Sequence, residues 1–285
     1  MRTKAVMIGA LGLISLGGVL AGAAQAEEIV AHTGATEPLL EGFNDDLTGV
    51  SLSGPVLGDM GLDAYAVGGT GMERFGTGDF DAATRAELLA RGWKMTARLR
   101  VAQSPDERGL VAVNLENIGG RRYDMNFGLD ANGDTFVRLN QTIVTSPQLT
   151  GIGPTHTLVG SGSTYHLFEL IYDPAEASAD LFVDGVEVMS DYEGHTTFVR
   201  QLGFYFAAYQ SYVGNIAEAR FEFLDCPCNE ADLGAPFGTL DFTDVIAFLG
   251  AFGAGEQAAD LAPPFGTFDF SDVLAFLGAF GAGCP

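Results

Sequence analysis

Basic residues are scarce in this sequence. Fourteen lysines and arginines stand against 37 aspartates and glutamates, which gives a formal net charge of −23. A nucleic-acid-binding protein needs a basic surface to neutralise phosphates, and no basic stripe is present, so nucleic acid is not expected as a partner. Histidine is also scarce, and no serine or cysteine motif surrounds any of the four, so we interpret them as ordinary strand or loop residues: His32, His156, His166 and His195.

Long apolar runs are missing except at the N-terminus. Arg2 and Lys4 precede an uncharged run over 5–23, and Ala24-Gln25-Ala26 has the small-x-small pattern of a cleavage site. This predicts a secretory signal peptide over 1–26 and a secreted, extracellular or envelope-associated protein. A retained membrane anchor is disfavoured because glycines interrupt the run. After cleavage no transmembrane segment is expected, and the charge becomes 12 − 37 = −25.

Residues 27–224 predict one β-rich domain. Apolar and polar residues alternate over 93–101 and 123–129, the period of a strand with one buried face. Asn132-Gly133 and Asp184-Gly185 are dipeptides that favour hairpin turns with positive φ at both positions. The pattern therefore predicts an antiparallel β-sandwich. Its further strands are expected at 110–115, 135–140, 165–172, 179–183, 186–189, 202–209 and 216–224, and a helix at 82–91 between Asp81 and Gly92.

One hairpin carries a family resemblance. Residues 165–193, YHLFELIYDPAEASADLFVDGVEVMSDYE, resemble the concanavalin-like jelly roll of lectins, laminin-G-like domains and some glucanases. The resemblance rests on an aromatic strand, a loop and the hairpin sequence LFVDGVEV at 181–188. The sequence IAEARFEF at 216–223 also fits the closing strand of such a domain. The resemblance implies a jelly-roll sandwich and supports the fold more than a function.

Glucanases of this fold place their catalytic carboxylates on one strand. A retaining glycosidase needs two carboxyl groups about 5 Å apart. Glu218 and Glu222 share a face of the last strand, but Arg220 lies between them and would neutralise both. We interpret the three as surface ion pairs and keep Glu218 and Glu222 as the candidates if the protein is an enzyme.

Two loops are candidates for binding. Tyr209, Tyr212 and Asn215 place two aromatic faces and an amide near one loop, which is typical of a sugar platform. The alternative is that these aromatics pack under the rim of the sheet. The stretch 130–134, DANGD, has the oxygen spacing of a calcium loop but lacks its glycine and distal acid, so a hairpin turn is the favoured interpretation.

The C-terminal part repeats itself. Ala231–Gly255 recurs as Ala259–Gly283 with a shift of 28 residues. Each copy is a loop followed by an apolar-faced helix, predicted at 244–252 and 272–280, and such copies bury each other's faces. Thr243 and Ser271 are expected as the N-caps.

Residues 228–285 resemble the dockerin modules, in the variant that ends in Gly-Cys. Dockerins are duplicated EF-hand-like calcium loops with helices, so the resemblance implies an attachment module that docks on a cohesin-like, scaffold or envelope protein. The matching positions are Asp232, Asp241, Asp244, Asp260, Asp269 and Asp272. Each loop is one residue too long and lacks its early oxygen ligands, so calcium is a possible cofactor and helix capping by these aspartates is the alternative.

The three cysteines leave one unpaired. Cys228 and Cys284 bracket the repeats, and a disulfide between them would join the ends of a module with a small core. Cys226 could exchange with Cys228, so which one pairs with Cys284 stays open. Three thiols with no histidine nearby match no zinc pattern.

The favoured interpretation is an exported, acidic, two-domain protein. Its jelly-roll domain would bind a glycan or protein without catalysis, and residues 225–285 would attach it to a partner. The alternatives are a polysaccharide-degrading glycoside hydrolase held by its dockerin, and a structural surface-display protein.

Overall fold

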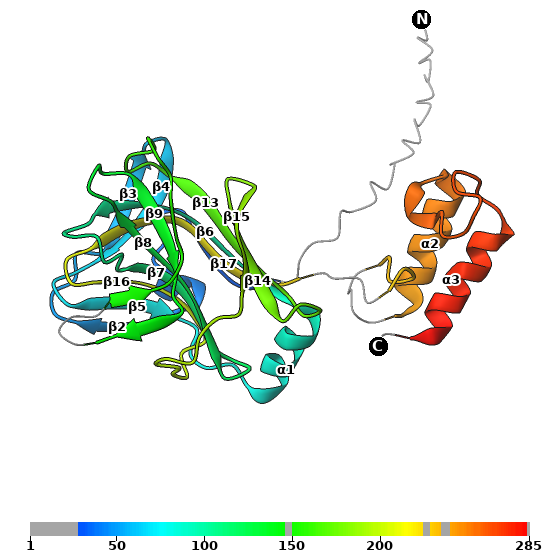
Figure 1. Ribbon diagram of the computed structural model, residues 1–285, viewed down its shortest axis with the longest axis horizontal. Coiled ribbons are helices and arrows are strands. Elements are labelled where there is room, and N and C mark those ends of the chain that lie inside the picture. Colours follow the sequence, from blue (N-terminus) through cyan, green and yellow to red (C-terminus); the bar gives the residue numbers. More distant parts are fainter. Residues whose placement is uncertain (1–27, 146–149, 225–228, 235–239, 284–285) are drawn as a thin grey trace, which may run out of the picture.

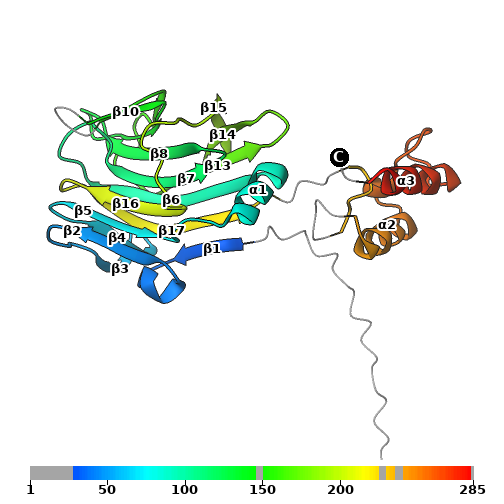
Figure 2. The same ribbon diagram turned by 90° about the horizontal axis from the view of Figure 1, so that it is seen from below.

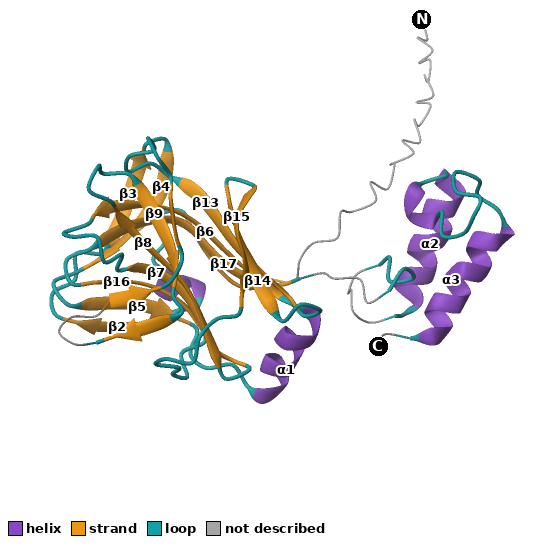
Figure 3. Cartoon of the chain, viewed as in Figure 1, coloured by secondary structure: helices purple, strands orange, loops and turns teal. Residues whose placement is uncertain are grey.

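The computed structural model describes residues 28–145, 150–224, 229–234 and 240–283. Strands dominate up to residue 223, and two helices make up most of the described C-terminal part (Figure 3). The boundaries at 26 and 224 that the sequence predicts stay predictions, and the signal peptide over 1–26 lies outside the described residues. Within the described ranges, no helix is both long enough and apolar enough to span a bilayer.

Two antiparallel sheets form the sandwich (Figure 1). The larger sheet has eight strands, with β1 (Glu28–Thr33) attached to β17 and the order β15 (Val186–Tyr192), β14 (Ser178–Val183), β13 (His166–Asp173), β6 (Trp93–Gln103), β17 (Val213–Phe223), β4 (Leu62–Gly68) and β3 (Gly54–Asp59). The smaller sheet has the order β12 (Thr155–Thr157), β9 (Thr135–Leu139), β8 (Arg121–Leu129), β7 (Val111–Ile118), β16 (Phe204–Tyr209), β5 (Met72–Gly76) and β2 (Asn44–Thr48). A separate ribbon pairs β10 (Thr142–Val144) with β11 (Thr150–Ile152), and a short 3₁₀ helix, η1, covers Pro38–Glu41.

Aromatic side chains join the two sheets. Trp93 of β6 meets Tyr123 of β8 edge to face at a centroid distance of 4.8 Å, and within its own sheet it stacks on Tyr172 of β13 at 5.3 Å. Phe204 of β16 stacks on Phe221 of β17 at 5.5 Å. All five rings are at least 95% buried. Because large aromatic rings bury the most apolar surface per residue, these contacts fix how the sheets face each other.

The predicted antiparallel β-sandwich is confirmed. Each of the nine strands expected from the sequence is present, and Asp184 and Gly185 both have positive φ at the β14–β15 hairpin. The β8–β9 hairpin differs from the prediction, since Gly133 has positive φ but Asn132 does not. There the Asp130 carboxylate accepts the backbone N–H groups of Asn132 and Asp134 and closes a longer turn, so this segment is a hairpin as favoured.

The predicted helix over 82–91 is also confirmed. Helix α1 (Ala82–Arg91) begins after Asp81, whose carboxylate accepts the Thr84 N–H at 2.8 Å. Gly92 ends it at φ 85°, and a Cβ there would come within 2.7 Å of the Tyr172 carbonyl oxygen, so glycine is required. Figure 2 shows the helix beside one end of the strands.

The repeated C-terminal part forms two helices that lie side by side, α2 (Phe242–Ala254) and α3 (Phe270–Ala282) (Figures 1 and 2). Phe248 stacks on Phe276 at 4.2 Å, and both are almost fully buried. These are equivalent positions of the two copies, so the repeat packs against itself as expected. A short 3₁₀ helix, η2 (Gln257–Ala259), follows α2.

The expected N-caps were wrong. Asp241 and Asp269 cap the helices in place of Thr243 and Ser271, which lie within the first turn. Both helices have a complete capping box, in which an aspartate at the third helical position returns a bond to the backbone of the cap. A carboxylate can accept two N–H groups at once, so it satisfies more helix-start donors than a hydroxyl.

Candidate functional site: a cavity lined by arginine and tyrosine

The outer face of the smaller sheet carries rows of polar side chains. Tyr205 of β16 lies opposite Asn114 of β7, and Asn114 lies opposite Asp124 of β8. Arg74 of β5 and Asn126 of β8 belong to the next row, joined through alanines on the strands between them. Alternation along each strand explains the arrangement, because the neighbouring positions face the core of the sandwich.

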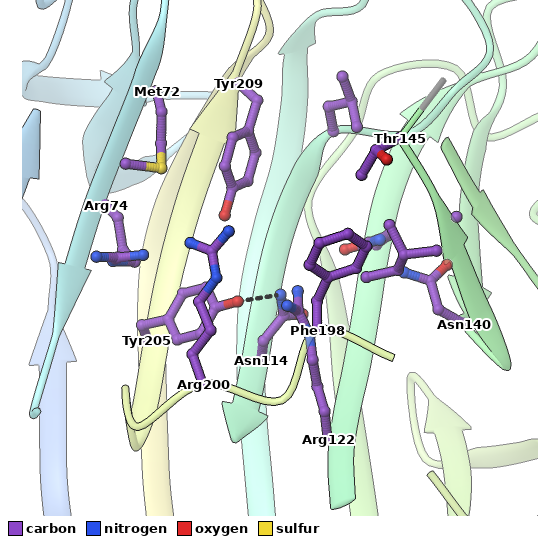
Figure 4. A pocket seen from close by; sticks show the side chains of 14 residues that line it. Met72, Arg74, Asn114, Arg122, Asn140, Thr145, Phe198, Arg200, Tyr205 and Tyr209 are labelled. Atoms are coloured by element: carbon purple, nitrogen blue, oxygen red, sulfur yellow. Dashed lines mark hydrogen bonds between the residues drawn. The ribbon is translucent and has the colours of Figure 1, made fainter. Parts of the chain in front are cut away.

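These residues line a cavity of about 120 Å³, which we call the Arg–Tyr cavity. The strands form its floor, and the β10–β11 ribbon and the segment 198–200 contribute to its walls (Figure 4). Its lining consists of Met72, Arg74, Leu110, Asn114, Arg122, Asn126, Asn140, Ile143, Thr145, Gly151, Phe198, Arg200, Tyr205 and Tyr209. Three arginines are among these residues and no carboxylate is.

A charged network lies directly beneath the cavity. The Arg122 guanidinium binds Glu116 at 2.8 Å and also contacts Asp124. The Tyr205 hydroxyl donates to Glu116 at 2.9 Å and accepts from the Asn114 side-chain amide at 3.1 Å. Neither carboxylate is exposed to solvent. Buried charges persist only when paired and hydrogen-bonded, so this network fixes the positions of Arg122 and Tyr205.

Electrostatics set the protonation of these groups. Burial raises the pKa of Glu116, and Arg122 opposes that rise. Burial would also raise the pKa of Asp124, but Arg122 and His195 outweigh it and lower the pKa. The pKa of Tyr205 is raised well above its usual range by burial, so its hydroxyl stays a donor at neutral pH.

Two buried amide oxygens of lining residues, those of Asn114 and Asn140, lack a partner among the described residues. The Asn114 side chain is fully buried, and its amide nitrogen is used by Tyr205, while its amide oxygen accepts no hydrogen bond from the described residues. Burying such an acceptor without a donor costs about 1–3 kcal/mol. The Asn140 amide oxygen also lacks a partner, but it lies against Gly151, where a Cβ would come within 1.9 Å of it. Asn114 is therefore a lining residue of the cavity with an unsatisfied acceptor.

The wall formed by 198–200 is held by backbone bonds at both ends. His195 exchanges two backbone hydrogen bonds with Arg122, each of 2.8 Å. The Arg200 N–H donates to Glu116 at 2.9 Å. Between them Phe198 has φ 54°, a conformation that costs free energy for a bulky residue, and its side chain is 41% exposed. In Figure 4 the ring of Phe198 and the guanidinium of Arg200 both lie at the cavity.

The predicted sugar platform is not brought together as a group. Tyr209 lines the Arg–Tyr cavity, and burial raises the pKa of its hydroxyl. Tyr212 is fully buried and its hydroxyl donates to the Asp106 carbonyl oxygen at 2.7 Å, which matches the alternative of packing under the rim. Asn215 lies in the larger sheet, where its amide donates to Asp59 at 2.6 Å.

Glu218 and Glu222 lie on β17, also in the larger sheet. Glu218 binds Arg220 at 3.1 Å, and Arg220 reaches Glu28 at 3.2 Å. Glu222 is 95% buried and binds Lys94 at 2.6 Å. Glu218 is thus paired with Arg220 as expected, whereas Glu222 is buried and pairs with Lys94 in place of Arg220, and neither carboxylate lines the Arg–Tyr cavity.

The aspartates of the repeats act as loop anchors. Asp244 accepts the N–H groups of Leu233, Gly234 and Asp241 at 2.7–2.8 Å. Asp272 repeats this at 2.9 Å with Leu261, Ala262 and Asp269.

These anchoring bonds use three acceptor sites of each carboxylate, which is the capping role expected from the sequence as the alternative to calcium binding. No three side chains of metal-binding type converge in the part of the chain that the structure describes. Asp232 is fully buried, and the second carboxylate oxygen of Asp260 accepts the Gly266 N–H at 2.5 Å. Calcium therefore stays a prediction.

A second surface lies on the repeat helices. Phe242, Ile246 and Leu249 of α2 follow helical spacing, and each is more than half exposed. The equivalent residues of α3 are Phe270, Leu274 and Leu277, and they are equally exposed. We call these six residues the exposed apolar face. The cysteines Cys226, Cys228 and Cys284 lie outside the described residues, so the disulfide stays a prediction.

The β-sandwich is similar to solved structures of other proteins. The chain resembles a carbohydrate esterase from the Shiga toxin-encoding bacteriophage phi24B, with a TM-score of 0.51, 12% identity, and coverage of 70% of this chain and 99% of the phage protein. An endo-β-1,4-glucuronan lyase from Trichoderma reesei gives a TM-score of 0.42 and 12% identity, covering 69% of this chain and 96% of the lyase. The botulinum neurotoxin serotype D binding domain gives a TM-score of 0.41 and 6% identity, and the match covers 69% of this chain and 48% of the toxin domain.

At 12% identity the likeness to the phage esterase shows the fold alone. It is consistent with the predicted concanavalin-like sandwich, while the dockerin resemblance receives no support and stays a prediction. No protein-family model and no curated protein sequence matches the chain.

Proposed function

We propose that this is an exported carbohydrate-binding protein whose sandwich binds a saccharide in the Arg–Tyr cavity. The observation that carries the proposal is that Asn114, whose buried amide oxygen lacks a donor, lines a cavity bordered by Tyr209 and Phe198. Sugars present hydroxyl donors on their edges and C–H groups on their faces, so an amide acceptor beside aromatic rings suits them. The fold it shares with a carbohydrate esterase is further support.

Removing the Tyr209 hydroxyl tests this site. Binding to the best ligand from a glycan array should weaken about threefold to tenfold in Tyr209→Phe, because one neutral hydrogen bond is lost. Isothermal titration calorimetry measures the effect. The matched control is Tyr165→Phe, which removes a hydroxyl that donates to Asp59 in the cluster that also holds Asn215.

Two outcomes of that experiment would contradict the proposal. One is the absence of any glycan ligand, which would favour a structural display protein. The other is equal weakening in both variants. Release of reducing ends from a polysaccharide by the purified protein would favour the enzyme alternative, and its loss in Glu218→Gln would assign the reaction to Glu218.

We also propose that the exposed apolar face attaches the protein to a scaffold or envelope protein. Each of the two helices exposes a row of three large apolar side chains at helical spacing, and exposed apolar residues in such a row are typical of an interaction surface. The resemblance to dockerins suggests the same role, with a cohesin-like protein as one possible partner.

Charge on that face should prevent attachment. In Leu249→Glu/Leu277→Glu, the fraction of protein that cosediments with the envelope of the source cells should fall at least about tenfold, because apolar centres dominate such interfaces. Both positions are more than half exposed, so the melting temperature should not change. The control Leu40→Glu/Val159→Glu changes two exposed apolar residues of the sandwich and should cosediment normally. Normal sedimentation of the helix variant would argue against this surface.

A further inference from the structure

The charge of the Arg–Tyr cavity is opposite to that of the chain as a whole. The sequence has 37 acidic and 14 basic residues, yet the cavity lining includes three arginines and no acidic residue. The carboxylates of the site, Glu116 and Asp124, lie beneath the guanidinium of Arg122 and are shielded from solvent. A ligand that enters the cavity therefore meets guanidinium groups.

The three arginines differ in how far they are already paired. Arg122 is fixed between two carboxylates and is 8% exposed, so its charge is compensated. Arg74 pairs with Asp46, whose side chain is 47% exposed. Arg200 is exposed at the wall of the cavity, and its guanidinium forms no ion pair with any residue that the structure describes. Arg200 is thus the cation most available to a ligand.

The ring of Tyr205 holds two of these cations in place. The guanidinium carbons of Arg74 and Arg122 lie 5.5 and 5.9 Å from its centroid. The Tyr205 hydroxyl is itself fixed by Glu116 and Asn114. Cation–π contacts of this kind position a guanidinium without neutralising it. Preorganised guanidinium groups lose less entropy when they bind an anion, so the geometry suits charged ligands.

We propose that the saccharide bound in the Arg–Tyr cavity is acidic, with a carboxylate or sulfate held by Arg200 and Arg74 and a hydroxyl donating to Asn114. This rests on the proposed carbohydrate-binding function and adds the ligand class. The planar fork of arginine matches two oxygens of either anion. The cavity measures about 120 Å³, so the charged group of one sugar residue enters it while the rest of a polymer lies outside.

Calorimetry with matched sugars tests the ligand class. The probes are oligomers of glucuronic and galacturonic acid, the same oligomers after reduction of the carboxylate to a hydroxymethyl group, and sulfated galactose oligomers. At least one acidic probe should bind about tenfold or more tightly than its neutral counterpart, the difference expected for a charge-assisted bidentate contact. Comparison of the uronate and sulfate arms identifies which anion is held.

Variants of the full chain assign the contact. Arg200→Gln should weaken binding of the acidic probe about tenfold and change binding of the neutral one less than about twofold. The control Arg98→Gln removes an equal charge from β6 in the larger sheet and should change neither. Arg200→Lys keeps the positive charge but lacks the planar guanidinium. Its affinity for the acidic probe should lie between those of the wild type and Arg200→Gln.

The outcomes separate this inference from the proposed function. If neutral and acidic probes bind equally and Tyr209→Phe weakens both, the cavity binds sugar but the acidic class is wrong. If acidic probes bind and Arg98→Gln weakens them as much as Arg200→Gln does, the contact is with the general surface and the inference fails. If no probe binds, both proposals fail.

Discussion

Replacing Arg122 with glutamine should lower the free energy of unfolding by about 3–5 kcal/mol, the cost of leaving buried charges without their partner. Glu116 and Asp124 are both fully buried and share this one guanidinium. Urea unfolding followed by tryptophan fluorescence measures the loss. The chain has one tryptophan, Trp93, and it lies in the sandwich core, so the signal reports the sandwich alone.

The neighbouring arginine is the control. Arg121 binds Glu193 at 3.4 Å, and its side chain is 40% exposed, so Arg121→Gln should cost less than about 1 kcal/mol. The loss of unfolding free energy caused by Arg122→Gln should also become smaller as the pH falls. Without Arg122 the folded-state pKa values of Glu116 and Asp124 rise, so the penalty is present above those values and disappears once both carboxyls are protonated. Equal costs for the two variants would contradict the network described above.

Replacing Asp272 with asparagine should release the loop that precedes helix α3. One carboxylate oxygen accepts the Leu261 and Ala262 amides, and the other accepts the Asp269 amide. Asparagine keeps one acceptor but turns an N–H₂ group toward one of these donors. Hydrogen exchange at the affected amides should accelerate at least about tenfold, measured on the full chain by NMR or mass spectrometry.

The repeat supplies an internal replicate. Asp244→Asn should produce the same acceleration at Leu233, Gly234 and Asp241, whereas Glu256→Gln, an exposed change in the same region, should produce none. The pKa of Asp272 is lowered chiefly by the Asp269 amide. Its stabilising contribution is therefore complete above about pH 4 and is lost as the pH falls through the lowered value. Unchanged exchange in both asparagine variants would show that these carboxylates do not hold the loops.

The first five strands were not predicted, and their composition explains why. β2 has the sequence NDDLT and is exposed along its whole length, and β3 contains Gly54 and Pro55. Neither segment alternates between apolar and polar residues. These are edge strands, and their conformation comes from pairing with β5 and β4. The paired residues of β2 and β5 lie 24 to 32 positions apart in the chain and those of β3 and β4 at most 12, but no local pattern identifies them.

Of the residues that line the Arg–Tyr cavity, the sequence suggested only Tyr209. The alternation at 123–129 correctly placed Asp124 and Asn126 on a polar face, but a polar face of a strand is ordinarily wet. Here Asp124 is fully buried, because the strands beside it and the segment around His195 cover it. Tyr212 and Asn215 were grouped with Tyr209 by closeness in sequence, yet successive strands of a sandwich can belong to opposite sheets.

The sequence by itself determined the features that depend on neighbouring residues. Alternation identified the central strands, and the duplicated segment with helical spacing predicted two helices that pack on each other through Phe248 and Phe276. Only the tertiary structure decided which polar residues meet. Arg74, Arg122 and Arg200 come from β5, β8 and the segment before β16, and the folding of two sheets brings them to one cavity. Strand periodicity is a local property, whereas strand order is set by burial of the whole core.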